Sequence, residues 1–288
     1  MKKMHSLKPA MTLIEIIFVI IVLGVVASIG ASIIAQTYKS YILQRAQYRA
    51  NIKTEIALNQ IANRLRYAIP GTIGARTTTS ATFTPITEIT GIAQRNVLQW
   101  VGEDGDSFEA ISSSTNRKPG WSGFIDLNQS TINQLVSPGS NYALFNAIKN
   151  NLGGFSLTPR LYFPPGYGPT NSNGSISVTG GNGENFSVSG LSPGDTIAER
   201  YKLAWSSYAI VYDPNDKNLW LYYHFDPSVG ADLSTASRSL LLPNVTTFSF
   251  QGSEGTMRIK ICQYAYTDQN TSLQNDTVHS CKEKIIQY

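Results

Sequence analysis

Residues 11–35 form a predominantly apolar stretch whose one ionisable side chain is Glu15. A helix needs roughly 20 apolar residues to cross the hydrocarbon core of a bilayer, so this stretch is long enough to be a transmembrane helix. Three lysines precede the stretch, and the next basic residue is Lys39. Because cytoplasmic flanks carry the excess of Lys and Arg, the sequence predicts a cytoplasmic N-terminus, with the C-terminal region across the membrane.

Glu15 is an unusual residue for a plain membrane anchor. A carboxylate at the centre of a transmembrane helix costs about 2.5–3.5 kcal/mol on insertion scales, and less near the membrane edge. Such a residue is by default functional and is expected to have a partner of opposite charge. Two simpler interpretations stay open. One is an ordinary anchor; the other is a signal peptide cleaved at small residues within 27–35, although a signal peptide carries its charge in the leader.

The segment from Lys8 to Ala35 resembles the N-terminal signature of type IV pilin-like proteins: a short basic leader, a small residue, a hydrophobic residue, Thr-Leu-Ile-Glu and an apolar helix. The resemblance implies that a prepilin peptidase cleaves between Ala10 and Met11 and then methylates the new N-terminal amine of Met11. It also implies that Glu15 faces the N-terminal amine of a neighbouring subunit during fibre assembly. Ala10 stands where Gly is usual in this family, and Met11 stands where Phe is commonest.

Two later segments are similar to parts of the large minor members of this family. Residues 240–250 resemble an "L-x-x-N-V-x-x-F-x-F" strand of J-type minor pseudopilins of type II secretion and of O-type proteins of MSHA-like pili. Residues 56–69 are similar to the equivalent helical stretch of J-type proteins. Glu15 argues against the K-type tip subunit, which lacks that acidic residue.

The resemblance therefore implies a non-enzymatic minor pilin or pseudopilin at or near the tip of a type II secretion pseudopilus or type IV pilus. The implied location is the bacterial inner membrane, crossed once, and then the fibre. The implied partners are prepilin peptidase, other major and minor pilins or pseudopilins, and the inner-membrane assembly platform. The choice among secretion, pilus and DNA-uptake systems stays open.

The sequence divides into four expected segments. Residues 1–10 would be the prepilin leader, 11–35 the transmembrane and assembly helix, 36–69 an amphipathic helix that continues into the globular domain, and 70–288 a periplasmic β-rich domain. Apolar residues recur at three- to five-residue steps in the third segment without Gly or Pro, as in an amphipathic helix, until Pro70-Gly71. A coiled-coil stalk is the alternative, but the apolar spacing does not keep a heptad.

The resemblance implies an α+β, pilin-like fold in which the long N-terminal helix packs on antiparallel β-sheet, with long loop insertions. Strand-like runs separated by turn residues predict hairpins at 97–111, 205–225 and 244–264 and a last strand at 279–287. A short helix is predicted at 142–151. Residues 164–195 are rich in Gly, Ser, Asn and Pro, which predicts a surface loop or flexible insertion with weak strands at 175–178 and 185–188. Trp121 and Phe124 are expected core anchors.

Charge and cysteine content narrow the functional classes. The formal net charge of +4 falls to +1 once Lys2, Lys3 and Lys8 leave with the leader (4 − 3), so no contact with nucleic acid is indicated. The two cysteines, Cys262 and Cys281, would form a disulfide in an oxidising periplasm, although two free buried thiols are the alternative.

Two further patterns bear on possible chemistry. Asp213, Asn215 and Asp216 resemble part of a calcium loop, but Lys217 breaks the alternation of ligands, so a turn is favoured and no cofactor is expected. His224 could belong to an acid–base pair, but a histidine at a strand end is favoured, and the sequence contains no HExxH or GxSxG motif.

Two other functions remain as alternatives. The chain could be a pilus-tip adhesin that binds surfaces or sugars through the loops of residues 112–200. It could also be a membrane-anchored periplasmic hydrolase, which lacks support from any nucleophile–base pair.

Overall fold

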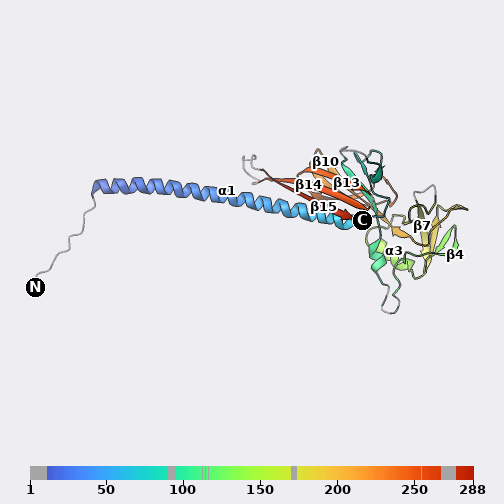
Figure 1. The fold of residues 1–288 in the computed structure, drawn as a ribbon. Coiled ribbons are helices and arrows are strands. Elements are labelled where there is room, and N and C mark those ends of the chain that lie inside the picture. The colour runs from blue at the N-terminus through green and yellow to red at the C-terminus, as the bar shows by residue number, and fades with distance from the viewer. Residues whose placement is uncertain are drawn as a thin grey trace, which may run out of the picture. The chain divides into compact units, whose positions relative to one another are not determined.

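A computed structural model describes residues 12–89, 95–111, 113, 115, 117–169, 174–253, 255–266 and 277–288. The chain falls into two compact units, the first made of residues 1–49 and 265–278, the second of residues 50–264 and 279–288. The first unit contains most of a single long helix, and the second unit contains the sheets (Figure 1).

Helix α1 runs without interruption from Leu13 to Leu65, about 80 Å at 1.5 Å per residue. Its C-terminal turns carry the apolar stripe expected from the sequence, because Leu58, Ile61 and Leu65 are at most 2% exposed. The helix ends four residues before the predicted end at Ile69. The reason is a competing pairing, since the N–H of Ile69 donates to the carbonyl of Val101 at 2.9 Å.

A central sheet of six antiparallel strands forms the middle of the second unit, in the spatial order β12-β11-β10-β3-β1-β2. A C-terminal sheet has the order β13-β14-β15. The hairpins predicted at 205–225 and 244–264 and the last strand are confirmed. The strand bounds are β1 Gly74–Arg76, β2 Thr84–Pro85, β3 Val97–Gly102, β10 Ser206–Asp213, β11 Asn218–Phe225, β12 Ser237–Leu242, β13 Val245–Ser253, β14 Thr256–Tyr266 and β15 Thr277–Gln287. The 3-10 turn η1 (Ile86–Glu88) follows β2.

One hydrophobic core joins α1 to both of these sheets. The helix contributes Ile61 and Leu65, the central sheet contributes Trp100, and the C-terminal sheet contributes Ile259 and Ile261, all of them buried. Burial of one large apolar side chain stabilises a fold by about 1.5–3 kcal/mol. The α+β class is therefore confirmed, with the second half of the long helix built into antiparallel sheet.

Residues 103–205 are inserted between two neighbouring strands of the central sheet. β3 and β10 pair with each other directly, Tyr208 opposite Trp100, although about 100 residues separate them. The insertion forms its own six-stranded sheet in the order β4-β5-β8-β7-β6-β9, and helix α3 (Tyr142–Asn151) has the predicted bounds. The strand bounds are β4 Asp126–Thr131, β5 Gln134–Val136, β6 Arg160–Tyr162, β7 Ser175–Asn182, β8 Asn185–Ser189 and β9 Lys202–Ala204.

The inserted sheet corrects the expectation of a loop or flexible insertion at 164–195. Ile176 and Phe186, from β7 and β8, belong to a second hydrophobic core that also holds Trp121 and Leu203. Trp121 is thus the core anchor that the sequence predicts, whereas Phe124 is 44% exposed and is not one. The weak strands predicted at 175–178 and 185–188 are confirmed as β7 and β8.

The hairpin predicted at 97–111 is wrong in its second half. Residues Gly105–Glu109 form the short helix α2 instead of a strand. Asp104 explains the difference, because its carboxylate accepts a hydrogen bond from the backbone N–H of Ser107 and caps the helix N-terminus.

Candidate functional site

The N-terminal part of α1 is an apolar rod with its side chains exposed. The helix is long and apolar enough to cross a membrane by length and composition. The part from Leu13 to Ala35 measures about 35 Å, against a hydrocarbon core of about 30 Å. Its exposed side chains lie all round the helix, as expected of a surface that lipid or other helices cover: Leu13, Ile14, Ile16, Ile17, Phe18, Val19, Ile20, Ile21, Val22, Leu23, Val25, Val26, Ile29, Ile33 and Ile34.

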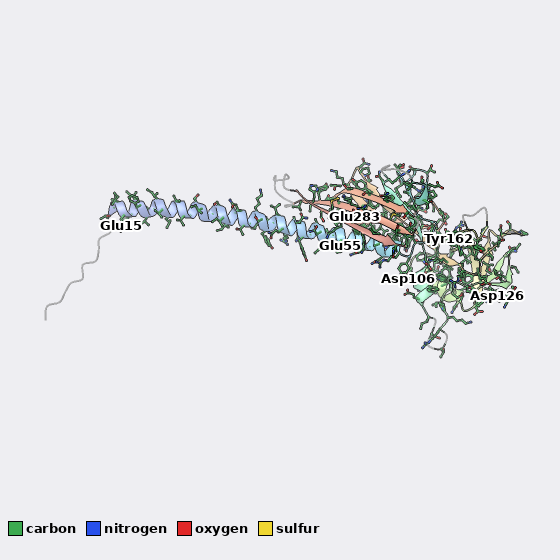
Figure 2. The ribbon with its side chains drawn as sticks, viewed as in Figure 1. Glu15, Glu55, Asp106, Asp126, Tyr162 and Glu283 are labelled. Atoms are coloured by element: carbon green, nitrogen blue, oxygen red, sulfur yellow. A yellow bond between two sulfur atoms is a disulfide. The ribbon has the colours of Figure 1, made fainter. Side chains whose placement is uncertain are left out.

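Glu15 lies in the first turn of α1 (Figure 2). A carboxylate at this position interacts favourably with the partial positive charge of the helix N-terminus. The Glu15 side chain is exposed and makes no ion pair within the described residues. The Glu15 carboxylate therefore has no counter-charge among the described residues. Ala10 and Met11, where the sequence predicts processing, lie outside the described residues.

The second half of α1 is joined to β15 by three polar contacts in register. The Oγ of Ser280 donates to Asn51 at 2.6 Å, and Lys284 donates to Asn59 at 2.6 Å. Between them, Lys282 and Glu55 form an ion pair at 3.7 Å. Four helix residues rise about 6 Å and two strand residues about 6.6 Å, so the two parallel elements keep pace.

Cys262 of β14 and Cys281 of β15 form the disulfide that the sequence predicts. The bond closes a segment with a sequence separation of 19 residues. It holds β15 on the C-terminal sheet and thereby holds the strand that contacts α1. A disulfide of this kind is typical of an oxidising compartment.

The carboxylates of the acidic turn between β10 and β11 accept hydrogen bonds from backbone N–H groups of the same turn. Asp213 accepts from the N–H of Asn215 at 2.9 Å, and Asp216 accepts from the N–H of Asn218 at 2.8 Å. These bonds are typical of a turn between strands. Among the described residues, no group of three or more His, Cys, Asp or Glu side chains lies close enough together to hold a metal ion.

His224 lies near the end of β11 with its ring between two aromatic neighbours. The ring centroid is 5.4 Å from that of Trp205 and 4.8 Å from that of Tyr223, and the backbone has a positive φ of 56°. Burial lowers the pKa of the His224 imidazole, which favours its neutral form. The ring is a packing element in this geometry.

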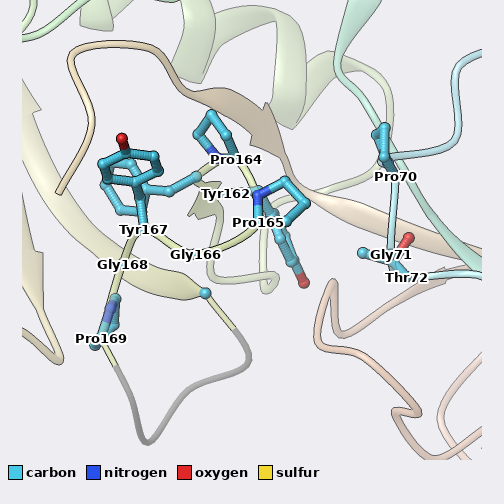
Figure 3. A pocket seen from close by; sticks show the side chains of 12 residues that line it. Pro70, Gly71, Thr72, Tyr162, Pro164, Pro165, Gly166, Tyr167, Gly168 and Pro169 are labelled. Atoms are coloured by element: carbon cyan, nitrogen blue, oxygen red, sulfur yellow. The ribbon is translucent and has the colours of Figure 1, made fainter. Parts of the chain in front are cut away.

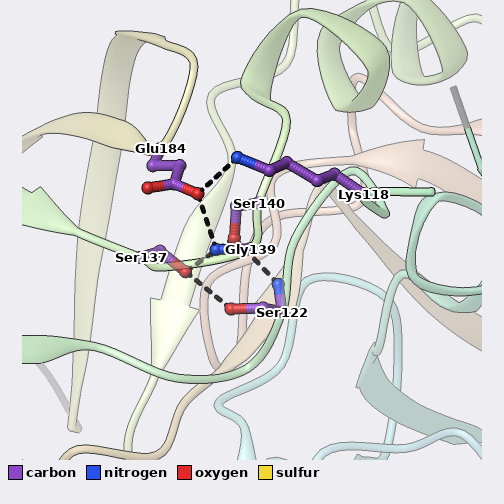
Figure 4. A network of polar contacts seen from close by, with 6 residues as sticks. All are labelled: Lys118, Ser122, Ser137, Gly139, Ser140 and Glu184. Carbon is purple, nitrogen blue, oxygen red and sulfur yellow. Dashed lines mark hydrogen bonds and ion pairs between the residues drawn. The ribbon is translucent and has the colours of Figure 1, made fainter. Parts of the chain in front are cut away.

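A polar network ties together three turns of the inserted sheet (Figure 4). Glu184 pairs with Lys118 at 2.7 Å and accepts from the N–H of Gly139 at 2.9 Å, and the hydrogen bond from Lys118 lowers the pKa of the Glu184 carboxyl. Nearby, the hydroxyls of Ser137 and Ser140 lie 2.7 Å apart. The two seryl oxygens are thus engaged in hydrogen bonds within the network, which suits a structural role in holding these turns together.

A pocket of about 380 Å³ opens beside β6 (Figure 3). Tyr167, 49% exposed, contributes an aromatic face, while Tyr162 is buried and donates its hydroxyl proton to the carbonyl of Pro227. Among the described residues the lining carries no charged side chain and is rich in proline and glycine: Pro70, Gly71, Thr72, Tyr162, Phe163, Pro164, Pro165, Gly166, Tyr167, Gly168, Pro169 and Gly174. Such a lining suits a neutral ligand with flat apolar faces.

Sequence reasoning placed Glu15 and the disulfide but missed the pocket and the polar network. The run Pro164-Pro165-Gly166-Tyr167-Gly168-Pro169 was the available signal for the pocket, because alternating proline and glycine fix a tight loop around an aromatic ring. The network had no local signal, since its members come from three separate turns.

Comparisons of the chain with protein-family models, with curated proteins and with solved structures found no match.

Proposed function

We propose that this chain is a non-enzymatic minor subunit of a pilin-like fibre, either a type II secretion pseudopilus or a type IV pilus. A prepilin peptidase would cleave it between Ala10 and Met11 and methylate Met11. The chain would be stored in the inner membrane through residues 11–35 and then move into the fibre, with residues 70–288 on the periplasmic side.

The observation that carries the proposal is the double character of α1. One continuous helix has an exposed apolar part with a single carboxylate, Glu15, and a second part that is built into the core of a β-rich domain. A soluble domain has no use for the first part, and a plain anchor has no use for its carboxylate.

Glu15 gives the assembly step its specificity in this proposal. In an apolar bundle of helices, a carboxylate gains most from an opposite charge held close by in low dielectric, and the N-terminal amine of a neighbouring subunit supplies one. The apolar faces of neighbouring α1 helices would pack together around this ion pair. The inserted sheet of residues 103–205 adds bulk that a repeating position in a shaft would have to accommodate, which favours a place at or near the tip.

The test is Glu15→Leu in the native host, with Glu55→Leu as the matched control. Both changes remove one carboxylate from α1, but Glu55 lies in the part of the helix that is packed on β15. We expect Glu15→Leu to insert into the membrane normally, because the change removes a charge from the span, and to be lost from sheared fibres. We expect Glu55→Leu to be incorporated. Normal incorporation of Glu15→Leu would contradict the role of Glu15.

A second measurement tests the processing step. Intact mass and N-terminal sequencing of the protein from its native membrane should give a chain that begins at N-methylated Met11. A chain beginning near residues 32–36 would indicate a secreted soluble protein, and an uncut Met1 would indicate a plain anchor.

One observation favours a second function, that of a tip adhesin. The neutral pocket around Tyr167 lies within the region 112–200 that this alternative names. Deletion of residues 166–194 would remove Ile176 and Phe186 from the core, so a point substitution is the sharper test. Tyr167→Ala should abolish surface adhesion and leave assembly intact if the chain is an adhesin, whereas Phe155→Ala, exposed but outside the pocket lining, should change neither.

A further inference from the structure

Four side chains form a surface on α1 that no other described residue covers. Tyr41, Arg45, Tyr48 and Arg49 are all exposed, Tyr41 by 58% and Tyr48 by 67%. With 3.6 residues per turn they fall within an arc of about 100° on one face of the helix. This surface, the tyrosine–arginine stripe, belongs wholly to the first compact unit.

The charges of the stripe are uncompensated within the part of the chain that the structure describes. Neither Arg45 nor Arg49 has an ion pair or hydrogen bond within the described residues. The two guanidinium groups are one turn apart, and like charges at this spacing destabilise a helix. Glu55 is the one acidic residue in the segment 36–69, and it is paired with Lys282. The helix therefore retains an electrostatic cost that a partner could remove.

The distance between the stripe and the apolar stretch of residues 11–35 indicates whether a lipid or a protein is the better partner. If residues 11–35 span the bilayer, Arg45 lies about 15 Å and Arg49 about 21 Å beyond Ala35 along the helix. The headgroup layer extends only about 5–8 Å beyond the hydrocarbon, and salt screens charges over about 8 Å. Anionic headgroups thus lie about one screening length from Arg45 and well beyond that from Arg49, so lipid leaves at least Arg49 without a counter-charge, although headgroups are within reach of Tyr38, about 5 Å beyond Ala35.

A second copy of this chain is a poor partner for the stripe. Its own helix would present the same two arginines, in a segment that has one acidic residue and six basic ones: Lys39, Arg45, Arg49, Lys53, Arg64 and Arg66. Pairing two such faces would bring like charges together.

We propose that the tyrosine–arginine stripe binds an amphipathic helix of a different protein, which carries carboxylates one helical turn apart. Each carboxylate would face one guanidinium, a pairing that can be bidentate. Apolar side chains of the same helix would pack on Tyr41 and Tyr48, since tyrosine and arginine are enriched where protein interfaces concentrate their binding energy. The inference rests on the membrane placement proposed above and is independent of fibre assembly.

The test uses the full chain in nanodiscs and two synthetic helical peptides of identical composition. One peptide has Glu residues on one face at four-residue spacing beside Leu residues; the other has the same residues scattered round the helix. We expect the matched peptide to bind roughly tenfold more tightly than the scattered one, and binding to weaken as salt rises. Arg45→Glu/Arg49→Glu should remove this preference, and so should Tyr41→Ser/Tyr48→Ser.

The control variant is Arg66→Glu/Arg117→Glu, which makes the same change in net charge at two exposed arginines off the stripe. It should bind the matched peptide as the unaltered chain does. Equal binding of both peptides, or binding that survives Arg45→Glu/Arg49→Glu, would overturn the proposal. So would loss of anionic-vesicle binding or of self-association in that variant with peptide binding unchanged.

Failure here is distinguishable from failure of the fibre proposal. Glu15→Leu should bind the matched peptide normally, because Glu15 lies far from the stripe along the helix. A chain that assembles into fibres and shows no peptide preference would therefore overturn only the inference about the stripe.

Discussion

The backbone N–H of Asp104 donates a 2.8 Å hydrogen bond to the carbonyl of Leu203, so the two ends of the inserted sheet meet at one point. Two further contacts stabilise the place where the two ends of the insertion meet. Glu103 pairs with Lys202 at 2.6 Å, and the indole N–H of Trp121 donates to the carbonyl of Asp104 at 2.9 Å. The first and last residues of the insertion 103–205 are therefore held together next to the end of β3.

Asp104→Asn should make the protein more stable relative to the unaltered chain as the pH rises. Burial raises the pKa of the Asp104 carboxyl, so its contribution is fully present below the unfolded pKa and is lost as the pH rises through the folded pKa. An amide keeps the cap on Ser107 without this loss. Denaturation at pH 3 and pH 7 should show the stability difference in favour of the variant growing by about 1.4 kcal/mol per unit of pKa shift. A pH-independent difference would contradict the assignment.

Ile61→Ala should destabilise the folded domain by about 2–5 kcal/mol, because Ile61 is 1% exposed in the core shared by α1 and the two sheets. Ile56→Ala is the matched control on the same helix. Its side chain is 51% exposed, so the change should stay within about 0.5 kcal/mol. Denaturant unfolding of the detergent-solubilised chain, followed by tryptophan fluorescence, measures both. Similar losses in the two variants would contradict the burial pattern.

Cys262→Ser/Cys281→Ser should lower the stability of the folded protein by about 3 kcal/mol, given the chain entropy released by a loop of this length. Cys281 is exposed, so a thiol reductant should reach the disulfide and lower the melting temperature of the unaltered protein about as much as the double substitution lowers it. The same reductant should leave the double variant unchanged. A reductant effect that persists in the double variant would exclude the disulfide as its cause.

His224→Phe should reduce the loss of folding stability that occurs as the pH falls. Because burial lowers the pKa of His224, its contribution is present above the unfolded pKa of about 6.5 and is lost as the pH falls through the folded pKa. Phenylalanine keeps the ring contact with Trp205 and cannot take up a proton. The effect should stay below about 1 kcal/mol, since the ring is partly exposed and solvent screens its charge. Melting curves between pH 5 and pH 8 would show it.

The elements that the sequence predicts well are those with a local signal. The period of α1, the hairpins β10–β11 and β13–β14, and helix α3 are each set by residues that are near in sequence. The inserted sheet has little such signal. β4 is polar apart from Leu127, and β6 and β9 have three residues each and pair with each other across about 40 residues, β6 pairing also with β7.

The same distinction applies to the candidate site. Glu15 stands out because its neighbours in sequence are apolar, and the structure places it in the first turn of α1 as that pattern predicts. The pocket at Tyr167 is lined by the loop after β6 and by Pro70, which follows α1 and is far from that loop in the sequence. No local pattern brings these residues together, so only the folded chain reveals the pocket.

The three contacts between α1 and β15 have a mechanical consequence. Helix and strand run side by side in the same direction, with Asn51, Glu55 and Asn59 opposite Ser280, Lys282 and Lys284. A pull along the helix axis therefore loads all three contacts at once in shear and does not open them one by one. The covalent bond from Cys281 to Cys262 passes that load into β14, so the last strand resists being peeled away under tension.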